Sequence, residues 1–163
     1  MTTIDQRYSD PEAVAAGWTE TRAVLEQAEL AWLSTVQPDG RPHVTPVAPV
    51  WFEDAAYFHT GPAEQKAANL RANPHVILTT GCNRWDAGLD VVIEGDAVRV
   101  TDEDLLKRLA EVWATKWDGR WQLEVNDGGF RHASFASHAF EITPTRIHAH
   151  SKGDPFAHTR HTF

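Results

Sequence analysis

Hydrophobic and polar residues alternate along several short stretches of the chain, and an alternation with a period of two is typical of β-strands. Stretches of this kind, bounded by turn-forming residues, predict strands. They cover residues 30–36, 43–52, 55–60, 75–81, 89–100 and 139–150. Spacings of three and four residues between apolar positions predict helices instead. One helix begins at Ser9 and ends near residue 29, one runs from Pro62 to Asn73, and one begins at Thr101.

Strands joined mostly by tight turns, with few helices between them, favour an antiparallel barrel over a sheet of alternating strands and helices. A chain of 163 residues has room for one domain. We therefore predict a single domain over residues 1–163. It comprises an N-terminal helix within 1–29, a barrel with two inserted helices over 30–150, and a C-terminal tail over 151–163. By itself, a terminal segment with so few apolar residues should be disordered.

Composition narrows the classes of function. The net charge of −8 argues against a general nucleic-acid binder and against a protein of anionic membrane surfaces. No apolar run approaches the ~18 residues of a membrane span, and the first residues lack the features of a signal peptide, so we expect a cytoplasmic protein. The single cysteine, Cys82, excludes an internal disulfide framework and a cysteine-based zinc module.

The segment around Thr60, Gly61 and Lys66 has the composition of an anion site. A strand is predicted to end at Thr60 and a helix to begin at Pro62, where the first backbone N–H groups of the helix have no partner within it. Lys66 lies about one turn into that helix, from which its ammonium group can reach the same anion. The ordinary alternative is a solvated lysine on an exposed helix face, with Thr60 and Gly61 acting as caps.

The predicted strand 43–52 contains two prolines, Pro46 and Pro49. Each proline removes a donor from the hydrogen-bond ladder, so this strand cannot pair regularly along its length. The main-chain groups of its neighbours are then free to bind the edge of a flat ring. The alternative is an edge strand protected from aggregation by proline. Taken with the anion site, the first interpretation indicates one ligand that has both a ring and a phosphate.

Three ordered blocks, residues 31–47, 57–60 and 66–76, resemble the pyridoxamine 5′-phosphate oxidase-like family of FMN- and deazaflavin-binding split-barrel proteins. The resemblance continues through 88–95 to the tail, where 152–156 and 159–163 are similar to a tail seen in one actinobacterial branch. It implies a mainly β fold with flanking helices, built on a six-stranded antiparallel split β-barrel. It also implies a homodimer with two cofactor sites across the subunit interface.

The resemblance also implies which residues bind the cofactor. Lys66 would hold its phosphate, and Val47, Ala48 and Pro49 would lie along its ring. The residues expected near the phosphate are His59, Thr60, Gly61 and Gln65. Many members of the family have Ser-Arg, or Arg alone, directly before the matching lysine. Here those positions are Glu64 and Gln65, which leaves the cofactor open between FMN and the deazaflavin coenzyme F-420.

F-420 carries an acidic tail that needs further basic residues. The candidates are Arg41, Arg71, Arg84, Lys116 and Arg120. Arg160, in the C-terminal tail, offers a rigid cationic group suited to a phosphate or a carboxylate. We hypothesise that the tail packs over a cofactor site, in its own subunit or in the partner subunit, with Arg160 facing the cofactor or substrate. The alternative is a loose end with an incidental arginine.

The function implied is that of an oxidoreductase that moves a hydride to or from a small organic substrate on a bound flavin or deazaflavin. We assign no side chain as a catalytic acid or base. The C-terminal arginine and histidine arrangement of true pyridoxamine phosphate oxidation is absent from the chain. The alternative is a non-catalytic carrier of flavin or haem, with His43 or His59 as the haem ligand.

The other histidines are weak indications of a metal. His148 and His150 face the same side of a predicted strand, and His158 and His161 lie in the tail. Because this pair has no third ligand at a suitable spacing, we predict structural or surface roles for these side chains and no metal site.

Overall fold

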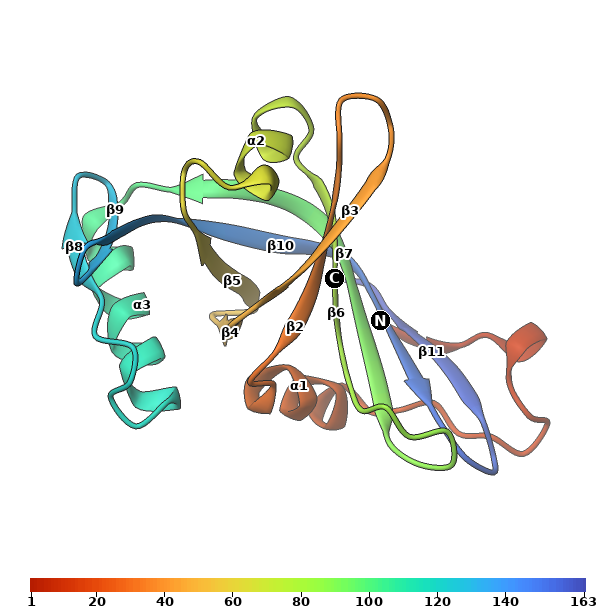
Figure 1. Cartoon of the computed structure of the whole chain (residues 1–163). Helices are drawn as coiled ribbons and strands as arrows, with labels where there is room; N and C mark the ends of the chain where they lie inside the picture. Colours follow the sequence, from red (N-terminus) through yellow and green to blue (C-terminus); the bar gives the residue numbers. More distant parts are fainter.

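The computed structural model describes the whole chain, Met1–Phe163, and consists mainly of strands (Figure 1). Its helices are α1 (Trp18–Gln27), α2 (Gln65–Ala72) and α3 (Glu103–Lys116), with a short 3-10 helix at Gln6–Tyr8. Its strands are β1 (Thr2–Ile4), β2 (Ala31–Val36), β3 (Pro42–Val47), β4 (Val50–Phe52), β5 (Ala55–Thr60), β6 (His75–Thr80), β7 (Leu89–Val100), β8 (Glu124–Asn126), β9 (Gly129–His132), β10 (Phe135–Ser151) and β11 (Ala157–His161). No helix is long and apolar enough to cross a membrane.

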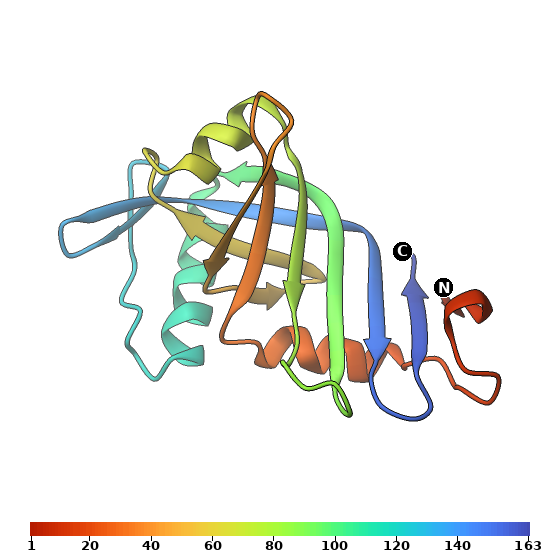
Figure 2. The ribbon, with the colours of Figure 1, turned by 45° about the vertical axis from the view of Figure 1, so that its right-hand side comes forward.

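The strands form one antiparallel sheet that curls into a split barrel (Figure 2). Its main path runs β1-β11-β10-β7-β6-β2-β3, while β4 pairs with β5, and β5 pairs with β10. The long strand β10 organises this arrangement, because β5 and β7 both pair with its residues Ala139–Ile142. The predicted class, an antiparallel split β-barrel with flanking helices, is confirmed. The sheet has eleven strands rather than six because one predicted strand is divided and further short strands are added.

The inside of the barrel is filled by the apolar positions that alternate along the strands. In β7, for example, Val91 and Ile93 are fully buried, while Val92 between them is partly exposed. Helix α1 lies across one end of the barrel (Figure 2). There Leu25 joins the core, and Trp18 packs edge-on against Trp51 at 5.9 Å between ring centroids. Alternation along each strand therefore decides which face enters the core.

Helix α3 covers a second, separate apolar cluster outside the barrel (Figure 1). Its residues Leu106, Leu109 and Trp113 are fully buried against β4, β5 and β9. The side chain of Asp102 accepts a hydrogen bond of 2.7 Å from the backbone N–H of Leu105, as expected for the predicted start of this helix. The wall beside β5 is therefore formed by α3.

The single strand predicted over 43–52 is wrong, because the structure divides it at Ala48 and Pro49 into β3 and β4. Strand β3 pairs with β2, whereas β4 pairs with β5. Helix α3 satisfies the main-chain carbonyls at the break. The indole Nε1 of Trp113 donates to the Ala48 carbonyl at 3.1 Å, and the Lys116 ammonium donates to the Pro49 carbonyl at 2.9 Å.

The predicted start of the first helix is also wrong, since α1 begins at Trp18 and not at Ser9. Ser9 accepts a hydrogen bond of 2.9 Å from the backbone N–H of His158, and the Asp10 carboxylate accepts one of 2.6 Å from that of Phe156. Both side chains thus bind the C-terminal segment instead of capping a helix.

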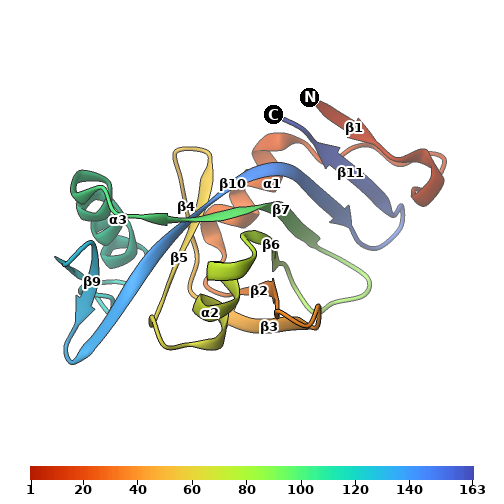
Figure 3. The same ribbon diagram turned by 90° about the horizontal axis from the view of Figure 1, so that it is seen from above.

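The C-terminal tail is ordered, contrary to what its composition alone predicts. Strand β11 pairs with β10 on one side and with β1 on the other. Thr159 is fully buried, and the ring of the buried His161 is hydrogen-bonded to Thr21 of α1 at 2.9 Å. The two ends of the chain therefore complete one edge of the sheet together (Figure 3).

Candidate functional site

The connection between β5 and α2 is built around a buried lysine. Helix α2 begins at Gln65, three residues later than predicted. Only 7% of Lys66 is exposed, and its ammonium is bonded to the Glu64 carboxylate. The other oxygen of that carboxylate accepts the backbone N–H of Gly61 at 2.8 Å. The Lys66 ammonium and the Gly61 N–H thus converge on one acceptor, which is a carboxylate of the chain itself.

Position 61 leaves little space for a side chain larger than that of glycine. A Cβ built there would lie 3.1 Å from the Glu64 carboxylate and 3.2 Å from the ring of Phe135 at the start of β10. Thr60 next to it is buried. Phe135 thus covers the connection from the side, a role that sequence reasoning missed because the residue lies 74 positions further along the chain (135 against 61).

Gln65 does not face Lys66. Its side-chain amide donates to Asn69 one turn further along α2, at 2.8 Å. Asn69 is fully buried and donates in turn to the hydroxyl of Thr35 in β2 at 2.9 Å. Sequence reasoning missed Asn69 as well. An amide on the apolar side of a short helix could have drawn attention to Asn69. Its hydrogen bond to Thr35 fixes α2 to the barrel.

His59 lies in an aromatic pocket under α3. Its ring packs edge-on against Trp113 at 5.2 Å and Trp121 at 5.1 Å, and its Nδ1 is hydrogen-bonded to the Ser137 hydroxyl at 3.1 Å. Burial lowers the pKa of His59 to about 4. The imidazole is therefore neutral at pH 7 and adds no positive charge to the anion site.

Trp113 connects this pocket to the segment Val47–Pro49. The same indole that packs on His59 donates to the carbonyl of Ala48. The structure thus brings two predicted parts of the site, the proline-broken strand and the end of β5, to one side chain. The carbonyls of Ala48 and Pro49 already have donors from α3, so a ring lying along Val47–Pro49 would use other groups.

Arg160 is not brought to this site within one chain. It lies opposite His148 in the β10–β11 pairing, whereas Thr60 lies opposite His138. Ten residues of strand separate those two positions (138 to 148), roughly 33 Å along β10. The Arg160 guanidinium lies 3.8 Å from the Asp5 carboxylate. Figure 3 shows β11 and α2 on different parts of the molecule.

The basic residues considered for an acidic cofactor tail are dispersed. Arg71 donates to the carbonyl of Pro62 at 3.4 Å, which places it at the β5–α2 connection. Lys116 is held by main-chain carbonyls, and Arg84 pairs with Asp86 at 3.1 Å. Arg41 and Arg120 are exposed, in the β2–β3 turn and after α3. Only Arg71 therefore has a contact at the predicted phosphate site.

Three of the histidines form a stack between β10 and β11. His148 is hydrogen-bonded to His158 at 3.0 Å and to the Glu94 carboxylate at 3.0 Å, and His150 stacks on His158 at 4.4 Å between ring centroids. His43, the other residue considered for haem, lies in β3 with its ring 3.5 Å from the Thr35 hydroxyl. The stacked rings bond to one another and to Glu94.

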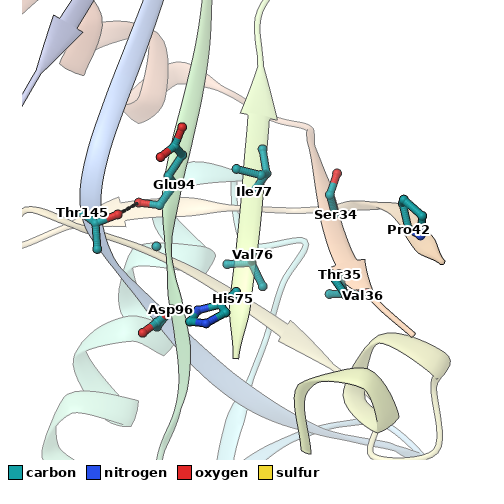
Figure 4. Close-up of a pocket in the computed structure, with 11 residues that line it drawn as sticks. Ser34, Thr35, Val36, Pro42, His75, Val76, Ile77, Glu94, Asp96 and Thr145 are labelled. Carbon is teal, nitrogen blue, oxygen red and sulfur yellow. Dashed lines mark hydrogen bonds and ion pairs between the residues drawn. The ribbon is translucent and has the colours of Figure 1, made fainter. Parts of the chain in front are cut away.

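A hollow of about 590 Å³ lies on the outer face of the sheet, over β2, β6 and β7 (Figure 4). Glu94 and Asp96 contribute two carboxylates to it, and Asp96 pairs with His75 at 2.6 Å. No lysine or arginine lines this hollow, and none of the predicted cofactor-binding residues does. Its charge disfavours a phosphate, in contrast to the donors around Lys66.

Comparisons with known proteins identify the fold independently. A family model described as pyridoxamine 5′-phosphate oxidase matches residues 18–151, and no curated protein matches the chain. A solved structure described as a putative pyridoxamine 5′-phosphate oxidase from Listeria innocua is 26% identical, with a TM-score of 0.61; the match covers 79% of this chain and 94% of that one.

Two further solved structures have lower identity and show the fold alone. A FAD-binding protein from Mesorhizobium loti is 18% identical, with a TM-score of 0.61, over 90% of this chain and 96% of that one. A heme binding protein from Mycobacterium smegmatis is 16% identical, with a TM-score of 0.65, over 92% of this chain and 60% of that one.

Proposed function

The chain belongs to the pyridoxamine 5′-phosphate oxidase family, and on that premise we propose that it is an oxidoreductase dependent on FMN or coenzyme F-420. It would transfer a hydride to or from a small organic substrate. When bound, the flavin or deazaflavin supplies the redox chemistry, and the protein supplies binding, orientation and electrostatics.

The observation that carries this proposal is the convergence of Lys66 and Gly61 on one anion. A lysine that is 7% exposed is costly to bury unless an anion accompanies it. The ammonium and the neighbouring N–H group are the kinds of donor that bind a phosphate. The residues present therefore fit the phosphate end of the cofactor once Glu64 is displaced. Arg71, in contact with Pro62, is the basic residue best placed to meet an acidic cofactor tail.

The remaining residues would position the cofactor and exclude water. Trp113 and Trp121 pack against the His59 ring between β5 and α3. Their packing buries the ring and so keeps it neutral. Val47 ends β3, and Ala48 and Pro49 form the break before β4, where the chain leaves its regular pairing. We propose that the cofactor ring lies along this break, and we assign no side chain as a proton donor.

We further propose that the protein is a homodimer with its cofactor sites at the interface. The outer face of β2 and β3 supports this, because Trp32 and Val44 on these adjacent strands are each about half exposed. Exposed apolar residues side by side on one sheet are typical of an interaction surface. In the dimer, the site around Lys66 would be completed by the partner subunit.

A second candidate is a non-catalytic carrier of flavin or haem. The similarity in fold to a heme binding protein over 92% of this chain favours it. The buried imidazole of His59 is neutral, and a histidine must be neutral to bind a metal through its ring nitrogen.

Titration of the purified protein with FMN, F-420 and haem, followed by absorbance and fluorescence, separates these functions. The main proposal expects saturable binding of FMN or F-420, turnover with reduced F-420 or a nicotinamide donor, and a dimer in light scattering. Binding without turnover identifies a carrier. Binding of haem with no binding of either FMN or F-420 overturns the oxidoreductase.

A further inference from the structure

The Glu64 carboxylate occupies the donors that a phosphate would need. Its Oε1 accepts the Gly61 N–H at 2.8 Å, and its Oε2 accepts from the Lys66 ammonium. Burial raises the pKa of Glu64, but hydrogen bonds from Lys66, Gly61 and the Thr60 hydroxyl outweigh it and hold the pKa below its ordinary value. The carboxylate is therefore charged at pH 7 and acts as an internal anion.

The two partners of this ion pair differ in what they lose by separating. The Lys66 side chain is 8% exposed, so its ammonium cannot turn out into water without rearranging the chain around it. The Glu64 side chain is 43% exposed and can rotate into solvent from a position that already reaches water. Glutamate is thus the partner that can leave.

The hydrogen bonds within α2 do not depend on the Glu64 side chain. Residue 64 is the N-cap of α2, but its carboxylate makes no capping bond to that helix and reaches back to Gly61 instead. The helix is held by the main chain, where the N–H of Ala68 donates to the Glu64 carbonyl at 3.1 Å. A rotation of the side chain therefore breaks no hydrogen bond of α2 and frees the Gly61 N–H and the Lys66 ammonium for another acceptor.

We infer that Glu64 is a resident anion that competes with the cofactor phosphate for Gly61 and Lys66, so that the phosphate binds only when the carboxylate rotates out. This inference rests on the proposed function, because it concerns the same site. It makes Glu64 a determinant of affinity. The carboxylate pairs with the Lys66 ammonium in the free protein and weakens the binding of any phosphate-bearing ligand.

Glu64→Gln tests the competition, because glutamine keeps the size of the side chain and removes its charge. We expect this variant to bind FMN or F-420 about tenfold more tightly than wild type, since one charge-assisted bond to Lys66 no longer competes. Inorganic phosphate, followed by the NMR shift of the Gly61 amide, should show the same gain. Glu12→Gln, which removes one charge from an exposed position in the N-terminal segment, is the control and should show no gain.

A measurement on the wild-type chain covers the case in which Glu64→Gln does not fold. Saturating phosphate should release the Glu64 carboxylate, and its pKa, followed by carbon NMR, should rise to or above the ordinary value for glutamate. A carboxyl group that titrates identically with and without saturating phosphate contradicts the release.

The outcomes separate the inference from the proposed function. A tenfold gain for either kind of ligand, lost again in the double variant Glu64→Gln/Lys66→Met, supports the inference. Equal affinities of wild type and Glu64→Gln for both flavin and phosphate overturn it. If neither form binds a flavin or deazaflavin while Glu64→Gln gains phosphate binding, the proposed function fails and the inference stands.

Discussion

Two lysines are withdrawn from water in this molecule, and their charges are balanced in different ways. Lys66 lies at the start of α2 against the carboxylate of Glu64. Lys116 lies at the end of α3 and donates to the main-chain carbonyls of Ala28 at 2.6 Å and Pro49 at 2.9 Å. Burial lowers the pKa of Lys116 to about 8, so it is still protonated at pH 7.

The difference between the partners separates a binding group from a structural one. A glutamate side chain on the surface can turn away and be replaced by another anion. The carbonyls of Ala28 and Pro49 belong to the backbone after α1 and at the β3–β4 break, and they have no alternative position. Lys116 therefore joins three elements permanently, whereas Lys66 keeps an ammonium available for exchange.

The largest effect we expect is the loss of stability in Lys116→Met. Methionine preserves the bulk of the side chain but leaves both carbonyls without their donor, which should lower the free energy of unfolding by about 2–4 kcal/mol. Urea denaturation measures this value. Lys107→Met, in the same helix but with only exposed ion pairs of 3.6–3.8 Å, is the control and should cost less than about 1 kcal/mol. If both variants lose the same free energy of unfolding, the two carbonyl contacts of Lys116 do not give it a structural role.

Lys66→Met should weaken cofactor binding and leave the stability of the fold nearly unchanged. Loss of its charge-assisted bond should weaken the binding of FMN or F-420 about 10–100-fold. Because its partner Glu64 is 43% exposed, we expect the free energy of unfolding to change by less than about 1 kcal/mol. Cofactor titration and urea denaturation of the same preparation give both numbers. An unchanged dissociation constant would remove Lys66 from the phosphate site.

His59 lies between the two regions, since its ring packs on Trp113 and its pKa responds to the charges of Glu64 and Lys66. Its pKa of about 4 in the folded protein lies below the ordinary value of 6.5. On acidification the unfolded chain therefore binds this proton first. The stabilisation is complete above pH 6.5 and is lost as the pH falls from 6.5 towards 4.

Between pH 7 and pH 5 this one group should cost roughly 2 kcal/mol of unfolding free energy. His59→Phe keeps an aromatic ring but has no group that titrates in this interval. Its free energy of unfolding should therefore fall by about 2 kcal/mol less than that of wild type between pH 7 and pH 5. Urea denaturation at both pH values provides the comparison, and the other buried histidines cancel in the difference. Identical pH dependence in the two proteins would place the imidazole in a more polar environment than the structure shows.

Local patterns predicted the parts of the fold that depend on near neighbours. Strands β5 and β7 have the predicted bounds, and α3 begins at its Asp102 cap. The predicted start of α1 was wrong, and the composition of the tail alone gave no sign of its order, for one reason. Ser9 and Asp10 resemble helix caps by themselves, but their partners, His158 and Phe156, lie 149 and 146 residues away. A local rule has no access to such a contact.

In the candidate site too, the sequence predicted what near neighbours determine and missed what the folded contacts determine. Thr60, Gly61 and Lys66 lie together because they are close in the chain, and a strand followed at once by a helix brings them to one place. Glu64 was interpreted as the loss of a positive charge, since the pattern could not show that its carboxylate turns back onto Gly61 and Lys66.

The sequence by itself determined the barrel and the segment with Lys66, because alternation and local turns carry those from residue to residue, and its ordered blocks carried the resemblance to the family. Only the tertiary structure decided which side chains share a partner. It brought Ala48 and His59 to the indole of Trp113, paired Arg160 with Asp5 some 33 Å along the strand from Thr60, and held Lys116 on two carbonyls. The physical reason is that a buried donor takes whichever acceptor the packed strands and helices bring within about 3 Å, whatever its position in the sequence.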